Sequence, residues 1–232
     1  MPPREGQINA LIRKAKEQFS VIKSEYESSL TQQSVSEGLS IDIKNLCENL
    51  RSALDYLAHD IRETHCPSAN KIDKIYFPIL SDINLFRNKM SQWYPGLDTA
   101  CPNLWNYLES IQPYYGESTI WLHHFNRLNN ENKHDSLVPQ IKSTRERVHV
   151  NIHSGESVSW DPSTVRFGKG VYIGGVPVDP STQMPIPHPS QEVKRIIWVD
   201  FHFKDIPGTA IGLLKLSFDG VERITSEVRK WL

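Results

Sequence analysis

The sequence lacks most of the features by which common classes of protein are identified on inspection. Its three cysteines, Cys47, Cys66 and Cys101, are too few and too scattered for a disulfide framework or a zinc knuckle. No apolar run approaches the roughly 18 residues that a membrane span needs. The opening residues, Met1–Glu5, do not resemble a signal peptide. We therefore expect a soluble cytoplasmic protein that keeps its thiols reduced and does not enter a membrane.

An excess of charge of one sign is also absent, because 26 basic residues face 27 acidic ones among the 232 residues of the chain. This balance excludes a protein that holds nucleic acid by bulk basic charge, so any such contact would be local. The sequence has no glycine-rich phosphate loop and no serine in a nucleophile elbow. His123 and His124 are adjacent and would point about 100° apart on a helix, so they do not have the spacing of a metal chelate. We expect neither a cofactor nor a metal site.

Apolar residues recur every three or four positions in the first 142 residues, which predicts a helical bundle. Ser40 is the expected N-cap of the second helix, and Cys66 before Pro67 is its expected end, because proline disfavours helical geometry in the residue before it. The expected helices cover residues 5–34, 40–66, 81–93, 101–111 and 117–136.

From residue 143 the apolar period becomes two, which is typical of strands. The expected elements are a strand at 148–152, a hairpin or bulged strand at 165–173, a strong strand at 193–204 and a closing helix from 218, with 209–217 ambiguous. The proline-rich segment 176–191 is expected to be a long loop that contains no inner strand. The predicted fold class is therefore α+β: a helical bundle over 1–142, and a small antiparallel β-sheet with a closing helix over 143–232, packed on the bundle.

One line of polar residues stands out on the helix expected at 117–136. With about 100° per residue, the line falls within an arc of roughly 80° and is displaced from the apolar face. Its members are His124, Arg127, Glu131 and His134. The following run, Asn129–Asn132, is poor in helix formers, which suggests that function rather than propensity placed it there. The plainer interpretation is a solvated helix face or a polar helix end.

A second polar line runs along the second helix, where Arg51, Asp55 and His59 are spaced by four residues and Arg62 follows. This pattern is that of an exposed ion-pair ladder. The sharper hypothesis places both polar lines in one groove between neighbouring helices. That groove would bring together Arg51, His59, Arg127 and His134.

Arg127, six intervening residues and His134 on the last long helix of an all-helical half resemble the HEPN superfamily of helical domains. The segment Asn49–His59, followed by Phe77-Pro78-Ile79 and by Asn130-x-x-Lys133-His134, is similar to a set of uncharacterised bacterial proteins. The resemblance covers about residues 5–140. It implies a metal-independent RNase of toxin or phage-defence type that cleaves RNA by attack of the 2′-hydroxyl. His134 would be its general acid or base, and Arg127 would hold the scissile phosphate, in a site shared by a homodimer.

The alternative is a non-catalytic HEPN-like module that interacts with a partner. Leu128 favours it, because active members of the superfamily usually carry a polar residue directly after the arginine. The alignment of Arg127 and His134 on one face favours the enzyme, whose expected partners are RNA and an antitoxin or other protein. His124, Glu131, Arg51, Asp55 and His59 are the supporting candidates for either site.

Overall fold

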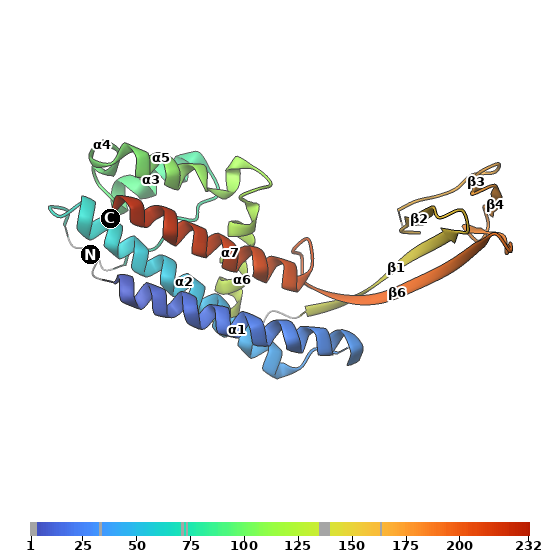
Figure 1. The fold of residues 1–232 in the computed structure, drawn as a ribbon. Coiled ribbons are helices and arrows are strands. Elements are labelled where there is room, and N and C mark those ends of the chain that lie inside the picture. The colour runs from blue at the N-terminus through green and yellow to red at the C-terminus, as the bar shows by residue number, and fades with distance from the viewer. Residues whose placement is uncertain (1–3, 33, 71, 73, 135–139, 163) are drawn as a thin grey trace. The chain divides into compact units, whose positions relative to one another are not determined.

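A computed structural model describes residues 4–32, 34–70, 72, 74–134, 140–162 and 164–232, without the side chains of 31–32, 132–134, 145–146 and 195–199. The chain divides into two compact units (Figure 1). The helical unit is Met1–Ile141 together with His202–Leu232, and the β-rich unit is Lys142–Phe201. Helices and small antiparallel sheets occur together, so the α+β class predicted from the sequence is confirmed.

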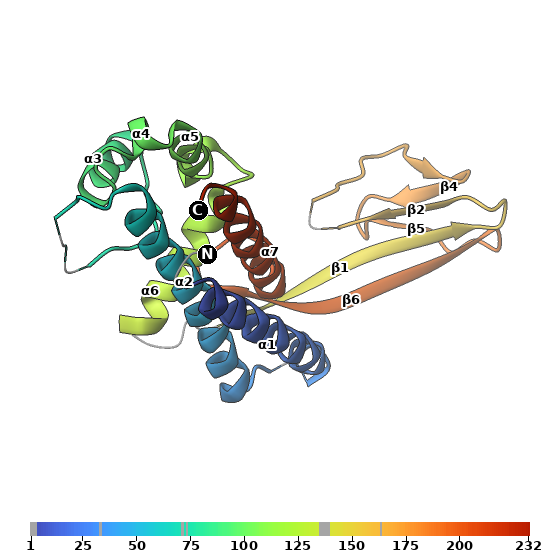
Figure 2. The same cartoon turned by 60° about the vertical axis from the view of Figure 1, so that its left-hand side comes forward.

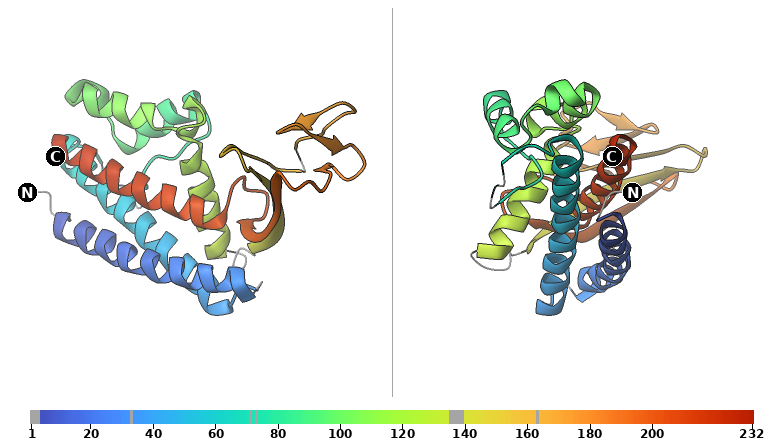
Figure 3. Two further views of the ribbon diagram at one scale, coloured as in Figure 1. Left: turned by 45° about the vertical axis from the view of Figure 1, so that its right-hand side comes forward. Right: turned by 90° about the vertical axis from the view of Figure 1, so that its left-hand side faces the viewer.

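The helical unit is built around two long helices and the C-terminal helix. Its helices are α1 (Glu5–Gln32), α2 (Glu37–His65), α3 (Ile83–Trp93), α4 (Leu97–Ala100), α5 (Pro102–Ser110), α6 (Ile120–His134) and α7 (Ala210–Val228), with 3₁₀ turns η1 (Pro113–Tyr115) and η2 (Arg229–Trp231). Helices α1, α2 and α7 pack along one another, and α6 contacts both α2 and α7 (Figures 2 and 3). The edge of the Phe86 ring meets Trp105, which packs α3 on α5. Helix α2 therefore contacts α1, α6 and α7, and the residues that it buries lie mostly on one face.

Helix α2 begins one turn earlier than expected. Its N-cap is Ser36, whose hydroxyl accepts a hydrogen bond from the Leu39 amide at 3.0 Å. Both Ser36 and Ser40 are good capping residues, and the earlier start brings Leu39 into the helix, where it is fully buried. The end at Cys66, next to Pro67, is where the sequence predicted it.

Helix α7 belongs to the helical unit and not to the strands that precede it in sequence. It begins directly after its N-cap, Thr209, so the ambiguous stretch 209–217 is helical apart from its first residue. Its buried residues face α1, α2 and α6. Position 220 requires glycine, because a Cβ there would collide with the Trp121 ring. The expected division at residue 142 is thus close to the first boundary between the units, but the closing helix returns to the bundle because its apolar face is covered there.

The β-rich unit contains two three-stranded sheets. One has the order β2–β1–β6, formed by β2 (Ser157–Trp160), β1 (Gln140–Ile152) and β6 (Gln191–Phe203). The other has the order β3–β4–β5, formed by β3 (Tyr172–Ile173), β4 (Val176–Asp179) and β5 (Met184–Pro185). Strands β1 and β2 are antiparallel, with Val148 opposite Trp160, and these two residues form a small core with Val150.

The expectation that 176–191 contains no inner strand is wrong, because β4 lies in the middle of its sheet and carries Pro177. Proline lacks an amide hydrogen but keeps its carbonyl, and the Pro177 carbonyl accepts a hydrogen bond from the Ile186 amide at 3.1 Å. The next residue, Val178, donates to the Val171 carbonyl at 2.9 Å. The short strand β4 therefore pairs with β3 and β5 although Pro177 lacks an amide hydrogen. Of the hairpin or bulged strand expected at 165–173, only Tyr172–Ile173 is a strand.

Candidate functional site

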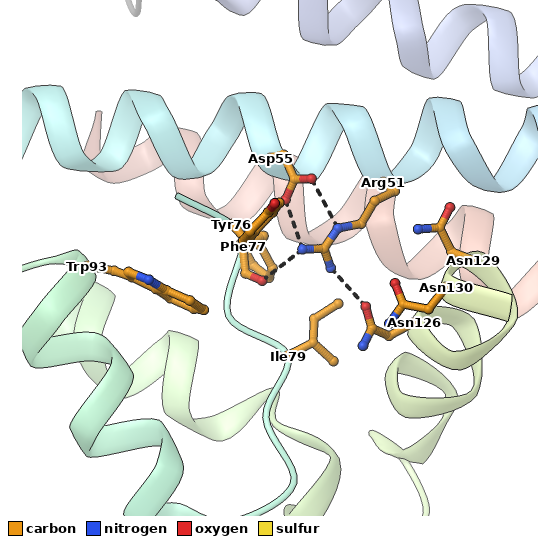
Figure 4. Close-up of a pocket in the computed structure, with 9 residues that line it drawn as sticks. All are labelled: Arg51, Asp55, Tyr76, Phe77, Ile79, Trp93, Asn126, Asn129 and Asn130. Atoms are coloured by element: carbon orange, nitrogen blue, oxygen red, sulfur yellow. Dashed lines mark hydrogen bonds and ion pairs between the residues drawn. The ribbon is translucent and has the colours of Figure 1, made fainter. Parts of the chain in front are cut away.

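The helical unit contains a pocket of about 310 Å³ between the middle of α2, the extended segment 76–79 and one face of α6 (Figure 4). The last residue of α3, Trp93, forms a further wall. The pocket is lined by Arg51, Asp55, Tyr76, Phe77, Ile79, Trp93, Asn126, Asn129 and Asn130.

Arg51 organises the pocket through its guanidinium group, and only 9% of the Arg51 side chain is exposed. Its Nε donates to Asp55 Oδ2 at 3.1 Å, and its Nη2 lies 2.9 Å from Asp55 Oδ1. Its Nη1 donates to Asn126 Oδ1 at 3.1 Å, and its Nη2 also donates to the Phe77 carbonyl at 3.4 Å (Figure 4). One side chain on α2 therefore joins the extended segment and α6.

Asp55 completes this arrangement by accepting the Phe77 amide hydrogen at its Oδ1, 3.0 Å away. The Arg51 guanidinium carbon lies 5.9 Å from the centre of the Tyr76 ring, a cation–π distance. The Tyr76 carbonyl accepts from the Tyr94 hydroxyl at 3.4 Å, and burial raises the pKa of this phenol. The opposite charges of Arg51 and Asp55 balance, so these two lining side chains bring no net charge to the pocket.

Three asparagines of α6 form the facing wall, because residues three and four positions apart share one face of a helix. Asn126 uses its Oδ1 to accept from Arg51. Asn129 is 1% exposed, and its side-chain Oδ1 is shielded from solvent without a hydrogen-bond partner among the described residues. A polar atom buried without a hydrogen-bond partner costs free energy and calls for an explanation.

Arg127 lies outside this pocket. Its Nε donates to Glu131 Oε1 at 2.6 Å, its Nη1 donates to the Asp205 carbonyl at 3.2 Å, and its Nη2 is 3.8 Å from the Asp205 carboxylate. The hydrogen bond to Glu131 is the main cause of the raised pKa of Arg127. The side chain of His134 is outside the described part of the chain, so the expected pairing of Arg127 with His134 stays a prediction.

His124 and His59 occupy two further environments. The His124 ring lies 5.6 Å from the ring of His123, and its Nδ1 is buried without a partner among the described residues. Burial is the main cause of its lowered pKa, and the charges of His123 and Arg127 act in the same direction. His59 lines a second pocket of about 410 Å³, together with Arg62 and others.

The two polar lines of the sequence thus do not form one groove among the described residues. Arg51 and Asp55 lie in the first pocket, His59 in the second, and Arg127 in neither. The physical reason is helical geometry: Asn126 and Arg127 are adjacent and point about 100° apart, and the face that meets Arg51 carries Asn126.

Sequence reasoning missed Asn126, Asn129, Tyr76 and Trp93 as site residues. Two signals pointed towards them. The run Asn129–Asn132 is poor in helix formers, and its first two residues line the pocket. The segments on which the resemblance to uncharacterised bacterial proteins rests also meet here, since Arg51, Phe77, Ile79 and Asn130 all belong to them.

No protein family model matches this chain, and neither curated proteins nor solved structures gave a match. Within the described ranges, no three His, Cys, Asp or Glu side chains are grouped so that they could hold a metal ion. No helix of the described part is long and apolar enough to cross a membrane. The pocket is lined by asparagine amides, aromatic rings and the Arg51–Asp55 pair, groups that can bind and orient a ligand.

Proposed function

We propose that the helical unit is a non-catalytic binding module and that the pocket around Arg51 takes a small polar ligand. The observation that carries this proposal is Asn129, which lines the pocket and whose buried Oδ1 has no hydrogen-bond partner in the described part of the chain. If the amide turns so that its Oδ1 faces the pocket, a ligand that donates a hydrogen bond satisfies this atom and recovers the free energy that its burial costs.

The organisation of the walls supports the same role. Arg51 and Asp55 fix α2, the extended segment and α6 to one another, so the pocket exists before any ligand arrives. A preformed pocket loses little conformational entropy on binding, which favours affinity for a small molecule. Asp55, the lining carboxylate, is held by Arg51 and by the Phe77 amide, which suits a structural role better than proton transfer.

A screen of small polar fragments by saturation-transfer NMR tests this proposal. We expect fragments that bind the wild-type chain and lose binding to Asn129→Leu, because the substitution removes the amide and keeps a similar side-chain size. Asn88→Leu is the matched control, since Asn88 is exposed on α3 and does not line the pocket. A screen in which no fragment depends on Asn129 would overturn the proposal.

A metal-independent RNase is the second candidate. The observation that favours it is the position of Arg127 on α6, one-third exposed and aligned with Glu131, in the pattern for which the chain resembles HEPN RNases. In this proposal His134 transfers the proton, Arg127 stabilises the charge that develops on the phosphate, and a homodimer forms the site. An antitoxin or other protein would be its partner.

Cleavage of a mixed RNA substrate in the presence of EDTA tests the second candidate. Loss of cleavage in both Arg127→Ala and His134→Ala, with activity kept in Lys215→Ala, would support it. Lys215 is a suitable control because it lies exposed on α7 and pairs with Asp219. A wild-type chain that leaves every RNA intact would exclude it.

A further inference from the structure

The pocket around Arg51 has little attraction left for an anion. Three hydrogen bonds use one N–H group on each guanidinium nitrogen, to Asp55, Asn126 and the Phe77 carbonyl, and Nη2 also lies in an ion pair with Asp55. A phosphate or carboxylate would have to displace Asp55 or lie beside its negative charge. The electrostatics of the pocket therefore favour an uncharged ligand.

The hydrogen-bonding groups of α6 differ in how firmly they are oriented. Arg51 holds the Oδ1 of Asn126, so the amide of Asn126 is fixed and its Nδ2 remains to donate. The Oδ1 of Asn129 has no partner among the described residues, so no hydrogen bond holds that end of the amide, which can rotate to donate or to accept. A ligand that fits both residues offers an acceptor to Asn126 and a second polar group beside it. Adjacent groups of this kind occur on the edge of heterocyclic bases, and asparagine pairs with such an edge through two bonds.

The remaining walls include two aromatic rings and one aliphatic side chain. The rings of Tyr76 and Trp93 and the side chain of Ile79 border the space that the asparagines face (Figure 4). Aromatic side chains stack on planar rings, and this stacking does not require charge. The volume of about 310 Å³ is at the small end of the range for ligand pockets, which suits one ring system.

We infer that the ligand of this pocket is an uncharged, planar heteroaromatic ring with a hydrogen-bonding edge, of the pyrimidine or purine type. The inference rests on the binding role proposed above and adds the chemical class of the ligand. Asn126 reads the acceptor on the ring edge, Asn129 pairs with the neighbouring group, and the aromatic walls hold the faces of the ring.

Calorimetric titrations with matched probes test the class of ligand. Uracil, cytosine and adenine are the planar neutral probes. Dihydrouracil keeps the polar edge of uracil but is not planar, and orotate keeps the planar ring but adds a carboxylate. We expect at least one planar neutral base to bind, and we expect dihydrouracil and orotate to bind at least tenfold more weakly than uracil if uracil is among the bases that bind.

Asn126→Asp tests the reading of the ring edge, because it keeps an acceptor for Arg51 and removes the donor that faces the ligand. We expect it to weaken binding of the base at least tenfold, while Asn88→Asp leaves binding unchanged. Thermal melting establishes that each variant is folded. Titration with the matching nucleoside and with a trinucleotide distinguishes a free base from a base within an RNA strand, because only a pocket that admits the strand binds the trinucleotide.

The outcomes separate this inference from the proposal beneath it. If anions or aliphatic amides bind in an Asn129-dependent way and the planar bases do not, the pocket is a binding site but the class of ligand is wrong. If the binding of no probe or fragment depends on Asn129, both the proposed binding site and the inferred class of ligand are wrong. Binding of a base that is unaffected by Asn126→Asp and Asn129→Leu takes place elsewhere and also overturns the inference.

Discussion

Two arginines of the helical unit each pair with a carboxylate four residues later on the same helix: Arg51 with Asp55 on α2, and Arg127 with Glu131 on α6. In sequence the two pairs have the same spacing and nearly the same chemistry. In the structure the side chains of the first pair are 9% and 22% exposed, and those of the second are 34% and 38% exposed.

This difference in burial changes what the pairs do. Arg51 also bonds Asn126 and the Phe77 carbonyl, so it holds α2, the extended segment and α6 in place. Charges removed from water interact strongly and become costly when one partner is lost. Arg127 remains near solvent, where an ion pair contributes little. The same spacing therefore produces a structural centre on α2 and a surface pair on α6.

The largest expected effect comes from removing each arginine in turn. We expect Arg51→Ala to lower the free energy of unfolding by about 3–5 kcal/mol, because it leaves Asp55 without its partner. We expect Arg127→Ala to lower it by about 1 kcal/mol or less, since its pairs are exposed. Urea denaturation followed by circular dichroism measures both values. Similar losses in the two variants would show that burial does not distinguish the pairs.

The pocket face of α6 allows a second comparison. We expect Asn129→Leu to raise the free energy of unfolding by about 1 kcal/mol, because it replaces a buried amide that has no partner among the described residues with an apolar side chain. Asn126→Leu should lower it, because Arg51 then loses an acceptor. The same denaturation experiment measures both variants. A destabilised Asn129→Leu would mean that its amide is satisfied in the apo protein.

Salt should separate the pairs by a smaller effect. Raising the ionic strength to about 1 M reduces the Debye length to about 3 Å and screens exposed charges. We expect the difference in the free energy of unfolding between wild type and Arg127→Ala to shrink under these conditions. The corresponding difference between wild type and Arg51→Lys should persist. Arg51→Lys is the suitable partner here because it keeps the charge and loses the planar fork. A salt-sensitive Arg51→Lys would contradict the burial of its ion pair.

The smallest expected effect concerns His124, whose pKa is lowered chiefly by burial and further by His123 and Arg127. The unfolded chain then binds a proton at a higher pH than the folded chain does. Stability from this group is present above about 6.5, the ordinary histidine pKa, and falls as the pH drops from there towards the folded pKa. We expect NMR titration to show the pKa of His124 rising in Arg127→Ala and unchanged in Arg51→Lys. Equal pKa values of His124 in wild type and Arg127→Ala would show that the charge of Arg127 does not lower this pKa.

Much of the secondary structure follows from local patterns. The apolar period predicted the long helices, Cys66 before Pro67 predicted the end of α2, and the alternation near residue 148 lies within β1. Local rules failed where two choices were equally good locally. Ser36 and Ser40 both suit an N-cap, and the burial of Leu39 accompanies the earlier start. Pro177 suggests the end of a strand when only its missing amide hydrogen is considered, but its carbonyl accepts a hydrogen bond that the Ile186 amide donates.

The candidate site was only partly predictable for a related reason. Arg51 and Asp55 were identified from their spacing, but the expected partners were Arg127 and His134, and the structure places Asn126 at the guanidinium. Periodicity tells which residues share a face of α6, but it does not tell which face meets α2. Tyr76 and Trp93 come from segments distant in sequence, and no local pattern connects them to Arg51.

The sequence by itself determined the long helices, the two long strands, the ends of several of these elements and the sets of residues that share a face, because these depend on backbone propensity and on the helical and strand periods. The tertiary structure alone decided that α7 packs with α1 and α2, that Pro177 lies in a central strand and that Arg51 is buried and hydrogen-bonded to Asn126. These outcomes depend on which apolar faces cover one another, and that choice involves contacts between residues far apart in the chain.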